Sequence, residues 1–350
     1  MTDEIKSYAS IRDQGIYGSY QELVGLHDCQ YSAYSGPWLL FLEKLLEQDI
    51  RLLSVEEAGR LSGCIAFCTR EAAGLRIADS LPYTQASFGG PVIRPDLPPT
   101  RQRETAAALI REFYALGKAE NWAACTIKMP PPAGYFQPEI EADYRLEREV
   151  LFTDLCRRPP LPSSIQWDVN KAVKHGIRAE IAQNVAALWE FYAIYKDEMT
   201  GRGAWVREKR FFELLAAELM PVGKALLIAA RGAAGEALGG ILLGLGNGIA
   251  DYTIQATSAA GRAWQANSLL IARAMEILAG KGYRLWNWYA SPNDGVQRFK
   301  KKWSTTSGIM RVHWKALDRE KVDILKSRGR EWLAAHFPWY YVLPFELMGN

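Results

Sequence analysis

Two stretches of this 350-residue chain repeat the same pattern of apolar and polar positions. In each, a glycine precedes an apolar run of strand length, at residues 61–67 and 237–243. A second strand follows and shares the tripeptide Ile-Ala-Asp, after Arg76 in one stretch and after Gly248 in the other. Helical spacing over 104–118 and 267–279 then leads into further strands at 124–128 and 284–289. A repeat unit of this length indicates a duplicated domain rather than a solenoid.

Each copy therefore combines a hairpin, a helix and a returning strand, which predicts an α+β fold with a mixed, mostly antiparallel sheet and packed helices. Prolines at 159, 160 and 162 interrupt regular structure between the copies. We expect a first domain over 1–160 and a second over 161–350. Helices are predicted over 164–175, 185–199 and 208–220 before the second repeat. A helix over 318–336 and an aromatic strand or wrap over 337–345 are predicted after it.

The helix expected after residue 290 places one lysine among apolar side chains. Ser291 would cap this helix, with Pro292 at its first position. Four positions at helical spacing then share one stripe: Val296, Phe299, Lys300 and Trp303. Lys300 is therefore expected on the apolar side, whereas Lys301 and Lys302 are expected to face solvent.

Composition and charge narrow the class of protein. The formal net charge is only +3, and no basic tail accompanies it, so the chain lacks the footprint of a dedicated nucleic-acid binder. The amino terminus is polar and shows no signal peptide, and the most apolar region is interrupted by Arg231 and Glu236, so no transmembrane segment is expected. The five cysteines and four histidines show no metal-ligand spacing. A cytoplasmic protein without a metal is predicted.

Several short motifs occur in a fixed order along the two halves. They are Gly89, Gly90 and Pro91; Asn170, Lys171, Ala172, Lys174, Gly176 and Ile177; Ala274, Gly282 and Tyr283; and Gly295, Phe299 and Lys300. In this order the chain resembles the FemABX-like branch of the GNAT acyltransferase superfamily. The resemblance implies two tandem GNAT-like domains around a shared cleft. It also implies transfer of an acyl or aminoacyl group to an amine.

The resemblance leaves the donor open between aminoacyl-tRNA and acyl-CoA, with a carrier-protein thioester as a third source. No sustained heptad run supplies the coiled-coil arm of some tRNA-dependent members. The turn before the helix at 267–279 carries Gly261, Arg262 and Gln265, and a helix amino terminus with an arginine can hold phosphate. An exposed turn pair is the structural alternative. We expect no tightly bound cofactor, because the donor is a cosubstrate.

The resemblance implies that Phe299 and Lys300 face the reaction centre, where a fixed cation would stabilise an oxyanion. A lysine whose stem merely covers aromatic residues is the alternative. Other candidates come from strand ends and loops, and they could orient the acceptor, relay its proton or bind an anion: Asp251, Tyr252, Asn287, Tyr289 and Arg202 in the second copy, and Tyr83 in the first.

We therefore predict an amide-forming acyl or aminoacyl transferase that acts on a cell-wall or envelope precursor or an amino sugar by direct attack. Two alternatives are a CoA-dependent GNAT N-acyltransferase and a catalytically silent binding paralogue. The partners expected are a small-molecule or lipid-linked acceptor, with tRNA and a peripheral membrane contact as further candidates. The sequence leaves the donor, the acceptor, the oligomeric state and substrate binding by the first domain open.

Overall fold

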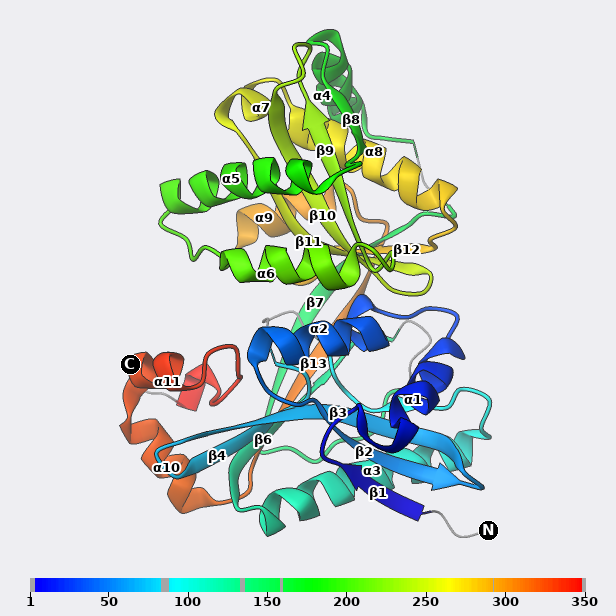
Figure 1. Cartoon of the computed structure of the whole chain (residues 1–350), viewed down its shortest axis with the longest axis vertical. Helices are drawn as coiled ribbons and strands as arrows, with labels where there is room; N and C mark the ends of the chain where they lie inside the picture. Colours follow the sequence, from blue (N-terminus) through cyan, green and yellow to red (C-terminus); the bar gives the residue numbers. More distant parts are fainter. Residues whose placement is uncertain (1–3, 83–87, 133–135, 158–159, 292, 348–350) are drawn as a thin grey trace. The chain divides into compact units, whose positions relative to one another are not determined.

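The chain divides into two compact units in this computed structural model, which describes residues 4–82, 88–132, 136–157, 160–291 and 293–347. Unit 1 comprises Met1–Asp28, Ala33–Glu149 and Gly308–Asn350, and unit 2 comprises Cys29–Ser32 and Val150–Ser307. The units thus differ from a single division after residue 160 at three places. The main boundary lies between Glu149 and Val150. Residues 29–32 lie with the second unit, and the carboxyl-terminal segment lies with the first (Figure 1).

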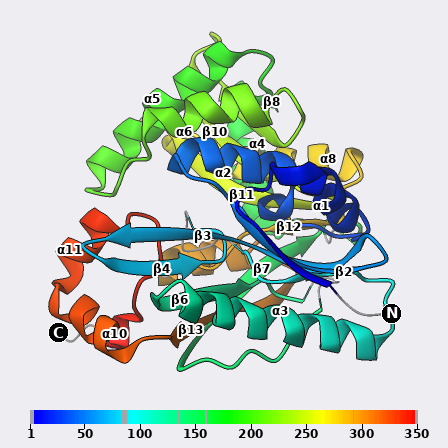
Figure 2. The same ribbon diagram turned by 60° about the horizontal axis from the view of Figure 1, so that its bottom comes forward.

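Unit 1 is a mixed sheet with helices on both faces. Its strands are β1 (Glu4–Tyr8), β2 (Arg51–Glu57), β3 (Arg60–Ala72), β4 (Leu75–Asp79), β5 (Val92–Ile93), β6 (Trp122–Met129), the first part of β7 (Tyr144–Asp154) and most of β13 (Thr306–Ala316). Its helices are α1 (Ile16–Gly25), α2 (Gly36–Leu46), α3 (Pro99–Ala119), α10 (Arg319–Ser327) and α11 (Gly329–His336). The order β1-β2-β3-β4-β6-β13 is antiparallel except between β4 and β6. Figure 2 shows α1 and α3 on opposite faces of β3.

The carboxyl-terminal segment joins unit 1 because its first strand completes the sheet of that unit. β13 pairs antiparallel with β6 over Arg311–Ala316, and apolar side chains beyond it pack against β4 and β6. The predicted single helix over 318–336 is wrong, because Gly329 adopts φ 76° and separates α10 from α11. Residues 337–344 form no strand, so the aromatic segment is a wrap that buries Phe337, Val342 and Leu343.

A buried ion pair lies at the carboxyl ends of β4 and β6. The Lys128 Nζ donates to Asp79 Oδ2 at 2.7 Å, and both side chains are almost completely buried. The backbone N–H of Tyr341, from the wrap, donates to the same Asp79 oxygen at 3.0 Å. Burial raises the pKa of Asp79, and the Lys128 charge opposes that shift. The pair therefore fastens the wrap to the sheet of unit 1.

Unit 2 repeats this plan with more helices. Its elements are α4 (Ser163–Lys174), β8 (Arg178–Ile181), α5 (Val185–Gly201), α6 (Lys209–Leu214) continued by a π-helical turn (Leu215–Leu219), β9 (Ala225–Arg231), β10 (Ala237–Leu245), β11 (Ile249–Thr257), α7 (Ala259–Ala263), α8 (Ala266–Gly280), β12 (Leu285–Asn287), α9 (Asp294–Lys301) and the end of β7. The sheet order is β7-β12-β11-β10-β9-β8. In Figure 1, α5 and α6 lie in front of this sheet, and α4, α8 and α9 lie behind it.

The predicted duplication is confirmed by matching strand pairings. β3 and β4 form an antiparallel hairpin, as β10 and β11 do. A helix then leads back to a strand that pairs parallel to the second hairpin strand: α3 leads to β6 beside β4, and α8 leads to β12 beside β11. The shared Ile-Ala-Asp tripeptide ends β4 at Asp79 and places Asp251 at the last pair between β11 and β12.

Candidate active site

Lys300 is a buried cation in unit 2, as the stripe at helical spacing predicts. Its side chain is only 7% exposed, its Nζ donates to the Trp288 carbonyl at 2.6 Å, and the Nζ lies 5.3 Å from the centroid of the Tyr252 ring. Among the described residues no carboxylate pairs with it. Burial lowers the pKa of Lys300 to about 8. The ammonium is thus charged at neutral pH and held against an aromatic face.

The helix that carries Lys300 starts differently from the prediction. Asn293, and not Ser291, caps α9, because its Oδ1 accepts from the Val296 N–H at 3.1 Å. The helix begins at Asp294, so the predicted first position, Pro292, precedes it and lies outside the described residues. Val296 is exposed, so only Phe299, Lys300 and Trp303 of the predicted stripe pack inward. Lys301 is exposed, in agreement with the contrast drawn from the spacing.

The strands beneath Lys300 separate at a defined point. The parallel pairing of β12 with β11 ends at Asn287 opposite Asp251, while β11 continues to Thr257. The register of β10 against β11 shifts at the same place, where Thr253 is the extra residue. The predicted strand over 284–289 is therefore shorter, and Tyr289 turns away with φ 57°. Bulges and left-handed residues of this kind concentrate at functional sites.

Asp251 and Asn287, both fully buried, form a hydrogen-bonded network at this separation. The Asn287 Nδ2 donates to Asp251 Oδ1 at 2.7 Å, and the Tyr289 N–H donates to Asn287 Oδ1 at 2.9 Å. The Ser32 N–H donates to Asp251 Oδ2 at 2.6 Å. Burial raises the pKa of Asp251 to about 6, although hydrogen bonds from Ser32 and Asn287 oppose the shift.

Tyr289 is connected to the same network through Ser32. Burial and the nearby Asp251 charge raise the pKa of Tyr289, whereas a hydrogen bond with the Ser32 side chain and the Arg207 charge lower it. The predicted candidates Asp251, Asn287 and Tyr289 therefore lie together. Ser32 joins them from a segment 219 residues earlier in the chain. No local pattern in the sequence marks Ser32 as part of this site.

The segment that carries Ser32 fits against the end of β10 only because residue 246 is glycine. Gln30 and Asn247 exchange backbone hydrogen bonds of 2.7 and 3.1 Å, and a Cβ added at Gly246 would lie 1.7 Å from the Gln30 carbonyl oxygen. Gly246→Ala must displace this segment. We expect it to lower the melting temperature by roughly 2 to 8 °C, since overpacking costs about 1–3 kcal/mol. We also expect transfer to slow by about 10- to 100-fold, because misplaced groups position substrates poorly.

Gly280→Ala is the matched control for thermal melts and turnover, because a Cβ there meets nothing within 4 Å. A Gly246→Ala protein with unchanged activity would show that the position of Ser32 is irrelevant to transfer.

The two predicted anion-binding arginines converge on an acidic side chain. Arg202 forms an ion pair with Glu198, and the Arg262 Nη1 lies 3.6 Å from the same carboxylate and donates to the Thr257 carbonyl at 2.5 Å. The Thr257 N–H also donates to Glu198, at 2.9 Å. The sequence analysis did not predict a role for Glu198, although its spacing of four residues from Arg202 suits a helical ion pair. Both arginines are thus already compensated, which weakens their assignment to phosphate.

The turn before α8 is held by α4, the helix formed by the Asn-Lys-Ala-Val-Lys run. The Lys171 Nζ donates to the Ala263 carbonyl at 3.1 Å, and His175 stacks on Trp264 with ring centroids 5.6 Å apart.

Gln265, the last predicted residue of this turn, adopts φ 63° and makes no side-chain cap to α8. Tyr252, whose pKa is raised chiefly by burial, donates to Gln255 at 3.1 Å.

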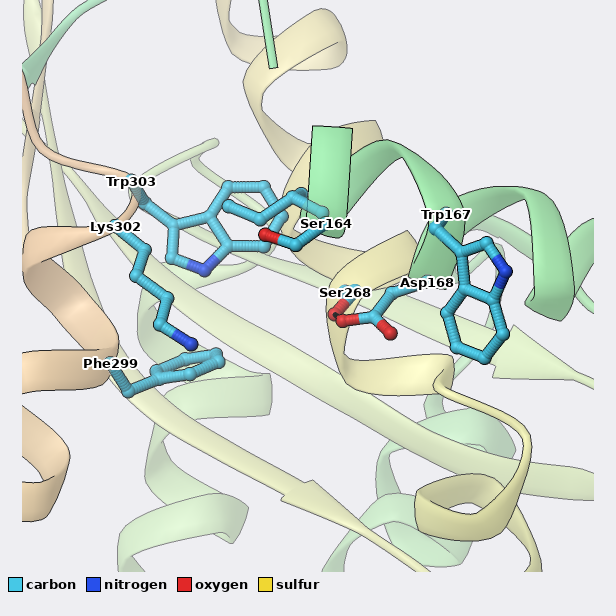
Figure 3. A pocket seen from close by; sticks show the side chains of 8 residues that line it. Ser164, Trp167, Asp168, Ser268, Phe299, Lys302 and Trp303 are labelled. Carbon is cyan, nitrogen blue, oxygen red and sulfur yellow. Dashed lines mark hydrogen bonds between the residues drawn. The ribbon is translucent and has the colours of Figure 1, made fainter. Parts of the chain in front are cut away.

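A pocket of about 280 Å³ lies on the face of α4, α8 and α9 (Figure 3). Phe299 forms part of its wall and packs partly buried against the core of unit 2. Phe299 thus points to the pocket, whereas Lys300 bonds to Trp288. Lys302, expected to face solvent, is exposed and also lines the pocket. Tyr83, the candidate from the first copy, lies outside the described residues.

Within the described ranges, no group of three or more His, Cys, Asp or Glu side chains could hold a metal ion. No helix in those ranges has the length and apolar character needed to cross a membrane.

Comparison with known proteins identifies both a domain and a fold. A family model of the acetyltransferase (GNAT) domain matches residues 168–301, which include most of unit 2. FemX has a TM-score of 0.69 at 15% identity, covering 93% of this chain and all of FemX. L-PGS of Bacillus licheniformis has a TM-score of 0.55 at 14% identity, covering 88% of this chain and 94% of that one. A comparison with curated protein sequences finds no match.

A third structure is the C-terminal DUF2156 domain attributed to a lysylphosphatidylglycerol synthetase of Agrobacterium fabrum, with a TM-score of 0.57 at 12% identity over 88% of this chain and 94% of that domain. The predicted α+β fold is confirmed, with a GNAT domain over most of unit 2 and a chain fold similar to that of FemX. The matched GNAT domain also identifies the chain as a transferase.

Proposed function

We propose that this transferase forms an amide by moving an acyl or aminoacyl group from an activated donor to an amino group, on a cell-wall or envelope precursor or an amino sugar. The observation that carries the proposal is the buried Lys300 ammonium beside the separating ends of β11 and β12. The fold likeness to FemX supports an aminoacyl group, and the GNAT domain supports an acyl thioester.

Lys300 would act on the charge that develops during transfer. When an amine attacks a carbonyl carbon, the carbonyl oxygen becomes an oxyanion. A fixed cation in a partly dry site stabilises that negative charge. The Trp288 carbonyl and the Tyr252 ring fix the position of the Lys300 Nζ before substrates arrive. Because the electrostatics are preorganised, little reorganisation is needed during the reaction.

The two substrates would approach from opposite faces of the unit 2 sheet. Tyr252 and the stacked Trp286 and Trp288 belong to the core beneath α8, so they lie on the face of α8 and α9. Neighbouring strand residues point to opposite faces, which places Asp251 and Asn287 on the face of α5 and α6. We assign the donor to the first face and the acceptor amine to the second, where the Asp251–Ser32–Tyr289 network would orient it.

Transfer would proceed by direct attack in a ternary complex. The amine nitrogen forms the new C–N bond, and the bond from the carbonyl carbon to the donor sulfur or ribose oxygen breaks. The amine loses one proton, and the departing thiolate or alkoxide gains one, so the charges balance. Positioning the two substrates then provides most of the rate enhancement.

The lowered pKa of Lys300 predicts how transfer depends on pH. The ammonium is charged below about pH 8 and neutral above it, so kcat should fall as pH rises through about 8. Lys300→Arg should retain a charge in this range, because an arginine pKa lies above about 12. We therefore expect the alkaline limb of the pH–rate profile to disappear in Lys300→Arg, even if its maximal rate is low. An unchanged limb in Lys300→Arg would assign it to another group.

The direct test is a transfer assay with labelled donors. Purified protein is incubated with labelled aminoacyl-tRNA or labelled acyl-CoA and with amino acceptors: a UDP-linked precursor peptide, an amino sugar and an aminolipid in vesicles. We expect label in an acid-stable amide with one donor class. No amide from any pair would favour the silent binding paralogue.

A further inference from the structure

One edge of the unit 2 sheet is open at β8. This strand is the last in the order of the sheet, and β9 is the only described strand that pairs with it (Figure 1). The Ala182 N–H donates to the Leu227 carbonyl at 2.9 Å, so the residues at even positions of β8 bond towards β9. The N–H and C=O groups of Ala179 and Ile181 therefore point away from the sheet. A row of this kind can pair with another strand.

Two backbone groups of this outward row are already capped by the chain itself. The Ile177 N–H donates to the Ala172 carbonyl at 3.2 Å, at the end of α4. The Ile181 carbonyl accepts from the Gln183 Nε2 at 3.0 Å. Four groups remain, and none of them has a partner within the part of the chain that the structure describes: the Ile177 carbonyl, the N–H and carbonyl of Ala179, and the Ile181 N–H. Any strand that pairs with this edge must match those four groups.

The charged side chains of β8 suit one register of pairing with a second copy of the strand. Arg178 and Glu180 are exposed, and neither forms an ion pair with a described residue. In an antiparallel pair centred on Ala179, Arg178 lies opposite Glu180 of the second copy, and Glu180 lies opposite Arg178 of that copy. A shift of two residues in either direction keeps the hydrogen-bonding pattern but places Arg178 opposite Arg178 or Glu180 opposite Glu180. Like charges directly opposite each other destabilise a strand pair.

We propose that β8 pairs antiparallel with β8 of a second copy of this chain, about a two-fold axis at Ala179. Each Ala179 N–H donates to the Ala179 carbonyl of the other copy, and each Ile181 N–H donates to the Ile177 carbonyl of the other copy. All four open groups are then used. The two capped groups, the Ile177 N–H and the Ile181 carbonyl, lie opposite each other and keep their own partners. The hydrogen bonds and the charges thus select the same register, and a two-fold contact closes after two copies.

Exposed apolar side chains flank both ends of β8. Val173, at the end of α4, is 56% exposed, and Val185, at the start of α5, is 52% exposed. In the antiparallel pair the Val173 end of one strand adjoins the Val185 end of the other, which adds apolar contact to the hydrogen bonds. The paired row is short, and interfaces below about 1,200 Å² belong to weak or transient complexes. We therefore expect a dimer that dissociates in the micromolar range, whether or not the chain transfers an acyl group.

The test is sedimentation equilibrium of the full chain from about 5 to about 500 μM, over which the mass should rise from one chain towards two. Arg178→Glu places like charges opposite each other at two positions, so it should weaken association by at least about tenfold. Glu180→Arg should weaken association to a similar extent. Lys281→Glu is the matched control, because it reverses an exposed charge of unit 2 outside β8 and should leave association unchanged. Thermal melts of each variant should match the original, since all three side chains are exposed.

Mixing the two variants separates strand pairing from a general effect of charge. A pair of one Arg178→Glu chain and one Glu180→Arg chain has opposite charges at both positions, so the mixture should associate about as strongly as the original protein. The double variant Arg178→Glu/Glu180→Arg exchanges the two charges and should also associate on its own. A chain that stays monomeric over the whole concentration range, single variants that associate like the original, or a mixture that stays monomeric would each overturn the proposal.

Discussion

Lys300→Met should reduce kcat by about 10²- to 10³-fold, the usual cost of removing one preorganised oxyanion stabiliser. Methionine keeps the length and apolar character of the stem but carries no charge. The loss should appear in kcat more than in KM, because the interaction is made only in the transition state. Lys301→Met, on the same helix but exposed, should retain nearly full activity. Equal losses in both variants would show that the lysines act as a general basic patch.

The same substitution should leave the melting temperature within a few degrees of the original. Because the folded pKa of Lys300 is below that of an unfolded lysine, its buried charge destabilises the fold fully below pH 8. That cost declines as pH rises from about 8 towards the unfolded value. Removing the charge offsets the loss of the hydrogen bond to Trp288. Melting temperatures measured at pH 7 would identify a Lys300→Met protein that is inactive only because it is unfolded.

Lys128→Met should have the opposite effect and destabilise unit 1 strongly. It removes the partner of the fully buried Asp79, and breaking a buried ion pair from one side costs about 3–5 kcal/mol. We expect a melting temperature about 10 °C lower, given the size of the chain. Lys209→Met, which removes an exposed pair with Glu213, should change it little.

Two further measurements separate the charge from the packing at Asp79. The unpaired carboxylate should bind a proton more readily in the folded state than in the unfolded state. The stability deficit of Lys128→Met should therefore be smaller at pH 5 than at pH 8. Adding Asp79→Asn to Lys128→Met should recover much of the lost stability. The substitution removes the unpaired charge, and the asparagine oxygen can still accept from the Tyr341 N–H. An equal deficit at both pH values would assign the loss to packing.

The duplicated fold could be predicted because each copy carries its pattern locally. The Ile-Ala-Asp strands, the helix at 267–279 and the burial of Lys300 follow from periods of two and 3.6 residues, which act between near neighbours. Burial of Lys300 amid exposed lysines is the clearest case. Helix ends were less predictable, because both Ser291 and Asn293 are good caps and only the packed helix selects Asn293.

Contacts between distant segments could not be read from the sequence. Ser32 reaches Asp251 across 219 residues, and Lys128 meets Asp79 across 49, so neither partner lies within a local period. The approach of Glu198 to Arg262 is a distant contact of the same kind, whereas the pair of Arg202 with Glu198 is local and follows from a spacing of four residues.

The division of the chain into units has a consequence for its biosynthesis. Unit 2 is built from residues 29–32 and 150–307, all of which leave the ribosome before the remainder of β13 and the wrap of unit 1. Until then β6 lacks its β13 neighbour, and Asp79 lacks the Tyr341 N–H. Domains usually fold in the order of synthesis, amino-terminal first. Here the unit that contains the carboxyl-terminal repeat can be completed first, and the unit that begins the chain closes last.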